Sequence, residues 1–358
     1  MKLWLKWSHW VNDGSAVGLF YFGLLFLAAT QGVNSFAGEI VPWVQNIFAN
    51  PYHGELAEKQ FLLTSLLLPL TASALQISTQ QGLEILNGAI FILGSYWVLK
   101  VYATEGKERF LVQAFLLYSL SAGLLLWFGK SDMWFFVLST LLVFYRKHFA
   151  VSLGVALLLG LTHFEQGLVV VAMLGLMFLV DLSTGQRLRD VFKAYFAILI
   201  GIALAKVMLL GFFALNEFGR TEGRLEFVFA RGYEVFVEPA LKNAGVLVFS
   251  YLSLFWLVFF GLASAFNVNK FSTAAVWLAF LVAMGVSFLT YDTTRVFSIV
   301  FWPFIVYMIL ETPVSRLEKV FNKQFMPMLI AAALLFPTVQ VKKSGELLFV
   351  GVLNYQKS

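Results

Sequence analysis

Long runs of apolar residues, separated by short polar segments, recur along the whole chain. A membrane-crossing helix needs about 20 mainly apolar residues, and eleven of the runs approach that length. The sequence therefore predicts an all-α, polytopic membrane protein that forms a single transmembrane domain. The predicted spans are residues 16–33, 83–102, 110–128, 132–145, 149–164, 167–183, 194–215, 244–265, 272–290, 296–311 and 325–340.

A further apolar run, residues 61–78, is predicted to re-enter the membrane rather than cross it. Lysines and arginines beside span ends favour the cytoplasmic side. With 61–78 re-entrant, the basic clusters at 107–109, 146–147 and 187–193 all lie on the side of the N-terminal lysines. We therefore predict a protein of the bacterial inner membrane with a cytoplasmic N-terminus and an external C-terminus. The active site is expected on the outer, periplasmic face, where the remaining polar residues near span ends gather.

The first predicted outer loop, residues 31–82, places a carboxylate next to the membrane. Glu39 follows the first span, and the nearby Trp43 and Ile47 share one helical face. This pattern predicts an amphipathic helix lying on the membrane surface. A carboxylate held there can act as a base or bind a metal, and the alternative is a solvated loop residue. We predict a catalytic role for Glu39, which is also the one candidate ligand for a divalent metal.

A short polar turn at residues 129–132 carries a cation and an acid close to hydrocarbon. Charge is costly at that depth, so Lys130 and Asp132 either neutralise each other or serve a substrate. We predict Asp132 as a second catalytic carboxylate and Lys130 as a substrate contact.

A second polar turn, Thr162–Gln166, closes the predicted span 149–164. His163 can donate or accept a hydrogen bond, or act as a base, near neutral pH. The alternative interpretation is a capped helix end. We predict His163 and Glu165 as substrate contacts.

Two later outer segments supply arginines, whose guanidinium groups match phosphate oxygens. The loop 216–243 contains Arg224 and Arg231, although its alternating charges equally suit a self-paired segment. Arg295 follows the ninth predicted span and pairs either with Asp292 or with a pyrophosphate. The residues predicted to contact the substrate or its lipid phosphate in these two segments are Arg224, Arg231, Asp292 and Arg295.

Composition agrees with a membrane protein and excludes several kinds of chemistry. Of the 358 residues, 60% are hydrophobic and 13% are charged, against about 25% charged in soluble domains. The sequence contains no cysteine, which rules out disulfides, thiolate metal sites and cysteine nucleophiles. The net charge of +5 reflects orientation and contact with membrane lipids rather than nucleic acid, so no nucleic-acid partner is predicted. The sequence also lacks nucleotide-binding glycine loops and zinc-protease motifs.

The order of these parts over residues 10–185 resembles the GT-C superfamily of integral membrane glycosyltransferases. The shared parts are a first span, an acid early in the first outer loop, an Asn-Pro-Tyr turn, a semi-embedded helix, a span ending in a polar turn with an acid, and a span ending in a polar cluster. Glu39 and Asp132 occupy the two acidic positions, although most members carry aspartate in place of Glu39. The resemblance implies a GT-C-like N-terminal module over residues 16–185, followed by C-terminal helices over 186–358.

By this resemblance, the protein transfers a sugar from a polyprenyl-phosphate lipid to a glycan or lipid-linked acceptor at the outer face, as a step in cell-envelope polysaccharide biosynthesis. Glu39 or Asp132 would orient or deprotonate the acceptor hydroxyl, and cations would stabilise the departing lipid phosphate. The phosphate candidates are Lys130, Arg224, Arg231 and Arg295, and the sugar contacts are His163 and Glu165.

Two other functions fit the sequence. An O-antigen-type polymerase or ligase would use a pyrophosphate-linked glycan and depend mainly on residues 216–243 and Arg295, with Glu39 dispensable. A lipid or glycolipid transporter would need ionisable residues deep in several spans, of which Lys206 is a rare example. No resident cofactor is predicted beyond the metal option at Glu39.

Overall fold

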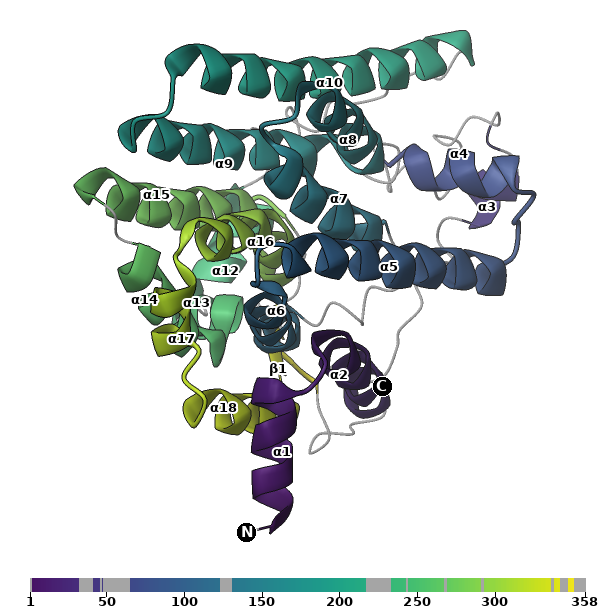
Figure 1. The fold of residues 1–358 in the computed structure, drawn as a ribbon. Helices are drawn as coiled ribbons and strands as arrows, with labels where there is room; N and C mark the ends of the chain where they lie inside the picture. The colour runs from purple at the N-terminus through teal and green to yellow at the C-terminus, as the bar shows by residue number, and fades with distance from the viewer. Residues whose placement is uncertain are drawn as a thin grey trace. The chain divides into compact units, whose positions relative to one another are not determined.

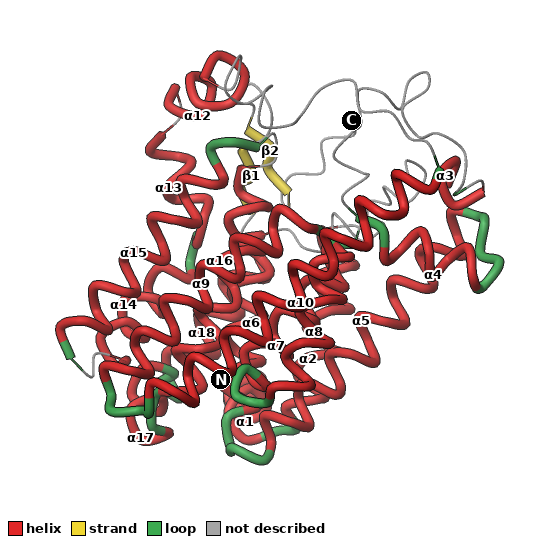
Figure 2. Tube along the Cα trace, turned by 90° about the horizontal axis from the view of Figure 1, so that it is seen from above, coloured by secondary structure: helices red, strands yellow, loops and turns green. Residues whose placement is uncertain are grey.

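The computed structural model shows a helical protein with one small β-hairpin (Figures 1 and 2). It describes residues 2–31, 41–45, 47, 65–122, 131–216, 233–242, 244–266, 269–290, 293–335, 338–341 and 347–350. The α-helices are α1 (Lys2–Asp13), α2 (Ala16–Gln31), α3 (Val41–Gln45), α4 (Leu67–Ala74), α5 (Gln80–Ala103), α6 (Glu108–Ala122), α7 (Asp132–Tyr145), α8 (Phe149–Thr162), α9 (Phe164–Ser183), α10 (Leu188–Leu215), α12 (Glu238–Lys242), α13 (Ala244–Leu252), α14 (Phe255–Phe266), α15 (Lys270–Ser287), α16 (Thr293–Glu311), α17 (Val314–Val320) and α18 (Phe325–Leu335). A π-helical turn, η4 (Tyr233–Val237), precedes α12, and the strands are β1 (Thr338–Val341) and β2 (Leu347–Val350).

Several helices are long and apolar enough to cross a membrane, which supports an integral membrane protein. These helices are α5, α9, α10, α15 and α16. The pair α13 and α14 passes the same test together, but the two helices meet at 68°, and Ser253 at the break is left-handed with φ 46°. Helices α7, α8 and α18 are apolar but shorter. The described residues thus hold five or six candidate spans, and the predicted count of about eleven is not confirmed.

The predicted span 325–340 is wrong at its C-terminal end. Helix α18 ends at Leu335, and residues 338–341 form β1, which pairs antiparallel with β2. Hydropathy alone does not separate an apolar helix from an apolar strand. The hairpin is the one departure from the all-α prediction among the described residues.

Within the run 61–78, the described part contains a single helix, α4, of eight residues. At about 1.5 Å per residue it spans about 12 Å, well short of the roughly 30 Å of hydrocarbon. Helix α3, from the predicted amphipathic segment, is only five residues long. The described residues 65–79 therefore contain no helix that crosses the membrane.

The chain divides into two compact units that interleave in sequence. Unit 1 comprises residues 1–33, 94–126 and 238–358, and unit 2 comprises residues 34–93 and 127–237. None of the four boundaries between the units falls near residue 185, where the predicted N-terminal module ends.

Unit 1 is built around α16, which is buried along nearly its whole length and contacts α6, α13, α14 and α15. Aromatic rings form much of this core; for example, Trp302 lies 5.3 Å from Tyr118 between ring centroids. The Tyr118 hydroxyl donates to the backbone oxygen of Ser298 at 2.9 Å. The buried hydroxyl of Tyr118 is thus paired with a backbone group of α16 inside this unit.

Unit 2 is organised by α7, α8, α9 and α10. Helices α7 and α8 are joined by a short turn, and α8 and α9 only by His163, so each of these pairs is antiparallel. The start of α7, the end of α8 and the start of α9 therefore lie at one end of this segment. The end of α7, the start of α8 and the end of α9 lie at the other.

Helix α10 packs closely along α8 through small residues. A Cβ placed on Gly160 would lie 2.6 Å from the Cβ of Ala205, and one placed on Gly201 would lie 2.5 Å from the backbone oxygen of Leu153. These contacts progress in the same direction along both helices, so α8 and α10 run parallel. Small residues four apart allow such an approach, as in small-xxx-small pairs of membrane helices.

Candidate functional site

Buried polar side chains gather at the end of unit 2 where α7 begins and α8 finishes. This polar end comprises Ser65, Asn87, Ser131, Asp132, Thr162 and Gln166, and each is at most 7% exposed. Buried polar groups are costly unless they are paired. Their concentration at one end of the bundle makes this end the candidate functional site.

The start of α7 is tied to two neighbouring segments by hydrogen bonds. The hydroxyls of Ser65 and Ser131 lie 3.2 Å apart, and the indole Nε1 of Trp134 donates to Oδ1 of Asn87 at 2.7 Å. These bonds hold the segment before α4 and the first half of α5 against α7. Asp132 is 3% exposed and is the first residue of α7, where the helix dipole favours a negative charge.

His163 separates α8 from α9 and interacts with an acid on α9. Its extended backbone (φ −161°, ψ 100°) ends α8, and its Nδ1 lies 3.6 Å from Oε2 of Glu165. The side chains are 13% and 37% exposed, respectively. His163 therefore lies at a helix junction and forms an ion pair with Glu165 when protonated, and its contact with a substrate stays a prediction.

Lys206 of α10 also reaches the polar end. Its Nζ lies 4.5 Å from the ring centroid of Phe164, a cation–π contact. Phe164 is the first residue of α9, so the ammonium group lies beside the His163–Glu165 turn. A cation, two acids and an imidazole thus occur together at this end of unit 2.

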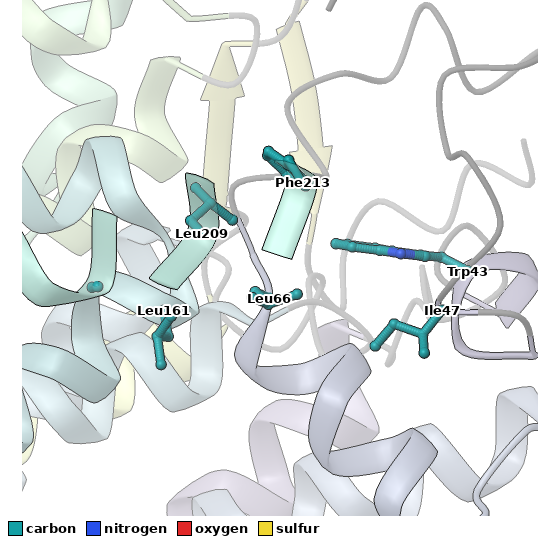
Figure 3. Close-up of a cluster of buried hydrophobic side chains, with 7 residues drawn as sticks. Trp43, Ile47, Leu66, Leu161, Leu209 and Phe213 are labelled. Atoms are coloured by element: carbon teal, nitrogen blue, oxygen red, sulfur yellow. The ribbon is translucent and has the colours of Figure 1, made fainter. Parts of the chain in front are cut away.

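An apolar cluster fixes part of the predicted first outer loop to the same end (Figure 3). Trp43 and Ile47, from α3 and just beyond it, pack in one cluster with residues near the ends of α8 and α10. The cluster comprises Trp43, Ile47, Leu66, Leu161, Ala205, Leu209 and Phe213, with Leu67, Leu70, Leu157, Phe164 and Phe212 packed against it. The apolar face that the sequence predicted for residues 40–47 is therefore buried against protein at Trp43 and Ile47.

Of the predicted site residues, the structure brings Asp132, His163 and Glu165 to one end of unit 2. Arg295 belongs to unit 1, where it lies half-buried in the first turn of α16. The neighbouring Thr294 hydroxyl lies 2.9 Å from that of Ser250. The other predicted site residues lie outside the described residues; they are Glu39, Lys130, Arg224, Arg231 and Asp292.

Glu39, the one candidate metal ligand, lies outside the described residues, so the predicted metal site stays a prediction. Among the residues that the structure describes, no group of three or more histidine or acidic side chains could hold a metal ion.

Sequence reasoning missed five members of the polar end, Ser65, Asn87, Ser131, Thr162 and Gln166, as well as the packing of Trp43. Gln166 and Thr162 belong to the polar turn Thr162–Gln166, but only its titratable residues, His163 and Glu165, were predicted as substrate contacts. Asn87 lies within an apolar run, and a buried amide inside a span is a signal that could have found it.

The opposite end of the α7–α9 segment holds a buried ion pair. Nη2 of Arg146 lies 3.3 Å from Oδ2 of Asp181, and both side chains are 2% exposed. Nη1 of Arg146 also donates to the backbone oxygen of Val143 at 3.1 Å. Arg146, which the sequence counted among the residues that set orientation, is thus buried in an internal pair.

Comparison with known proteins identifies no relative: no family model, no curated protein and no solved structure matches the chain.

Proposed function

We propose that the protein is a membrane glycosyltransferase that moves a sugar from a polyprenyl-phosphate lipid to a glycan or lipid-linked acceptor at the outer face of the bacterial inner membrane. The observation that carries this proposal is the burial of Asp132 at the polar end of unit 2, the same end of the α7–α9 segment as the His163–Glu165 turn. Apolar helices long enough to span a membrane support a lipid-borne substrate. The resemblance of residues 16–185 to the GT-C superfamily supports the reaction class.

The proposed reaction needs three kinds of side chain. A carboxylate, Asp132 or Glu39, orients the acceptor hydroxyl or takes its proton while the acceptor oxygen bonds to the anomeric carbon of the sugar. The bond between that carbon and the lipid phosphate breaks, and a cation stabilises the charge that develops on the phosphate. His163 and Glu165 orient the sugar by hydrogen bonds to its hydroxyl groups. Lys130, Arg224, Arg231 and Arg295 remain the phosphate candidates, and Glu39 the candidate metal ligand.

A second candidate is an O-antigen-type polymerase or ligase that uses a pyrophosphate-linked glycan. The observation that favours it is the position of Arg295 in unit 1. Arg295 lies in the first turn of α16, next to the hydrogen-bonded hydroxyls of Thr294 and Ser250, and a helix start of this kind attracts phosphate.

Transfer from a polyprenyl-phosphate sugar in membranes, with protein abundance measured in parallel, tests the two candidates. Asp132→Asn and Glu39→Gln keep the side-chain shape and remove the basic oxygen. Loss of the general base should lower turnover by about 10²–10⁴-fold, while donor binding persists. Arg295→Ala should weaken donor binding and turnover together. Full activity in both carboxylate variants, with loss in Arg295→Ala, would reject the transferase proposal in favour of the polymerase.

A further inference from the structure

Two buried side chains at the polar end carry hydrogen-bonding atoms without a partner among the described residues. These atoms are Nε1 of Trp43 and Oε1 of Gln166. Trp43 is 4% exposed and Gln166 is 5% exposed. Both side chains are therefore more than nine-tenths buried, and neither atom can be satisfied by bulk water.

The two side chains belong to the same region of unit 2. Trp43 is a member of the apolar cluster against which Phe164 packs, and Gln166 lies two residues further along α9. Other polar groups around them are paired: Ser65 with Ser131, and Trp134 with Asn87. Because folded proteins pair nearly all buried polar atoms with protein groups or ordered water, two exceptions in one region of unit 2 mark it as a place where a polar ligand can bind.

The chemistry of the two atoms limits what that partner can be. The indole Nε1–H only donates a hydrogen bond, and the amide Oε1 only accepts one. A hydroxyl group does both. An ionised phosphate accepts but has no hydrogen to give to Oε1 of Gln166, so it satisfies only half of the requirement. A ligand rich in hydroxyl groups, such as a hexose, satisfies both atoms.

We propose that Gln166 and Trp43 hydrogen-bond hydroxyl groups of the sugar that the lipid donor carries. Trp43 donates from Nε1, and Gln166 accepts at Oε1. The inference rests on the proposed transferase function, and it assigns sugar recognition to two neutral residues alongside the charged pair His163–Glu165.

Binding of two lipid probes to the full-length protein in detergent tests this inference. One probe is a polyprenyl-phosphate hexose, and the other is the same polyprenyl phosphate without sugar. Gln166→Met keeps the length of the side chain and removes the amide. It should weaken binding of the hexose lipid by about 5- to 30-fold, the effect of losing one buried hydrogen bond. Its affinity for the lipid without sugar should stay within about twofold, the scatter expected when no hydrogen bond to that ligand is lost.

Gln113→Met is the matched control. Gln113 is also a buried glutamine, but its Nε2 donates to the backbone oxygen of Val11 at 3.1 Å. This variant should lower the melting temperature and leave the affinity ratio of the two lipids unchanged. Gln166→Met should leave the melting temperature unchanged or raise it, because it removes an unpaired buried acceptor. Trp43→Phe, which keeps an aromatic ring and removes only the donor, provides a second test if Gln166→Met does not fold.

The outcomes separate this inference from the function on which it rests. If wild type binds the hexose lipid more tightly than the plain lipid and both Gln166→Met and Trp43→Phe keep that preference, the sugar contact is rejected and the transferase proposal survives. Equal weakening for both lipids would also reject a sugar contact. If wild type binds neither lipid, the proposed function falls together with the inference.

Discussion

The two ends of the α7–α9 segment bury polar side chains in opposite ways. At one end, Arg146 and Asp181 satisfy each other. At the other, Asp132 and Gln166 are both buried, and the amide oxygen of Gln166 has no partner in the described part of the chain. Burial of charge is therefore not itself a sign of function. The distinction lies in whether the buried atoms already have their partners within the protein.

The largest expected effect on stability comes from removing one partner of the Arg146–Asp181 ion pair. Arg146→Ala leaves Asp181 buried without its cation, and loss of one partner of a buried pair costs about 3–5 kcal/mol. The free energy of unfolding in mixed micelles should fall accordingly. The double variant Arg146→Met with Asp181→Leu should recover most of this loss, because it removes both charges. A single variant as stable as wild type would show that the pair does not stabilise unit 2.

A smaller effect is expected from the helix contact that holds the two ends in place. Gly201→Ala brings a methyl group to 2.5 Å from the backbone oxygen of Leu153, and such overpacking costs about 1–3 kcal/mol. Gly211→Ala on the same helix is the control, because a Cβ there meets no atom within 4 Å. It should be neutral or stabilising by up to about 1 kcal/mol. Equal stability of the two variants would contradict the close approach of α8 and α10.

The smallest effect concerns an exposed ion pair in unit 1, the counterpart to Arg146–Asp181. Nζ of Lys323 lies 3.2 Å from Oδ1 of Asp13, and its hydrogen bond holds the pKa of Asp13 below the ordinary value of 3.8. Because the pKa is lowered in the folded protein, the stabilisation is complete above the ordinary pKa and is lost as pH falls through the folded value.

Wild type should therefore exceed Asp13→Asn slightly in melting temperature at pH 6, and the difference should vanish as pH falls below 3.8. Thermal unfolding of the two proteins across this pH range measures it. A difference that grows on acidification would reverse the predicted sign. Exposed ion pairs of this kind contribute little to stability at any pH. A loss of stability in Asp13→Asn as large as that in Arg146→Ala would contradict the expected difference between exposed and buried ion pairs.

Hydropathy located most helices of this fold within a few residues, because long apolar runs have a single dominant interpretation. The helices α5, α9 and α15 each overlap a predicted span almost completely. The break between α13 and α14 was not predicted, since it occurs at Ser253 without a proline or glycine. The β-hairpin was missed because Thr338–Val341 directly follows an apolar run, and its alternation of polar and apolar residues is only four residues long.

The candidate site was predictable where it depends on charge and less so where it depends on neutral groups. Asp132, His163 and Glu165 stand out in the sequence because charged or titratable residues are rare near hydrocarbon. Gln166 and Asn87 do not stand out, because only the fold reveals which neutral amides are buried and which have partners. The indole nitrogen of Trp43 belongs to the same class, since an aromatic residue near a span end is otherwise an ordinary membrane anchor.

The parallel contact between α8 and α10 has a consequence for the order of biosynthesis. Helix α9 lies between them in sequence, so the small-residue face around Gly160 has no partner until residues 201–205 have left the ribosome. Insertion of α8 and α9 as a hairpin therefore precedes the docking that completes unit 2. The polar end is assembled late during translation, and a chain arrested before Leu188 would contain Asp132 and Gln166 but not α10, the helix that packs against α8.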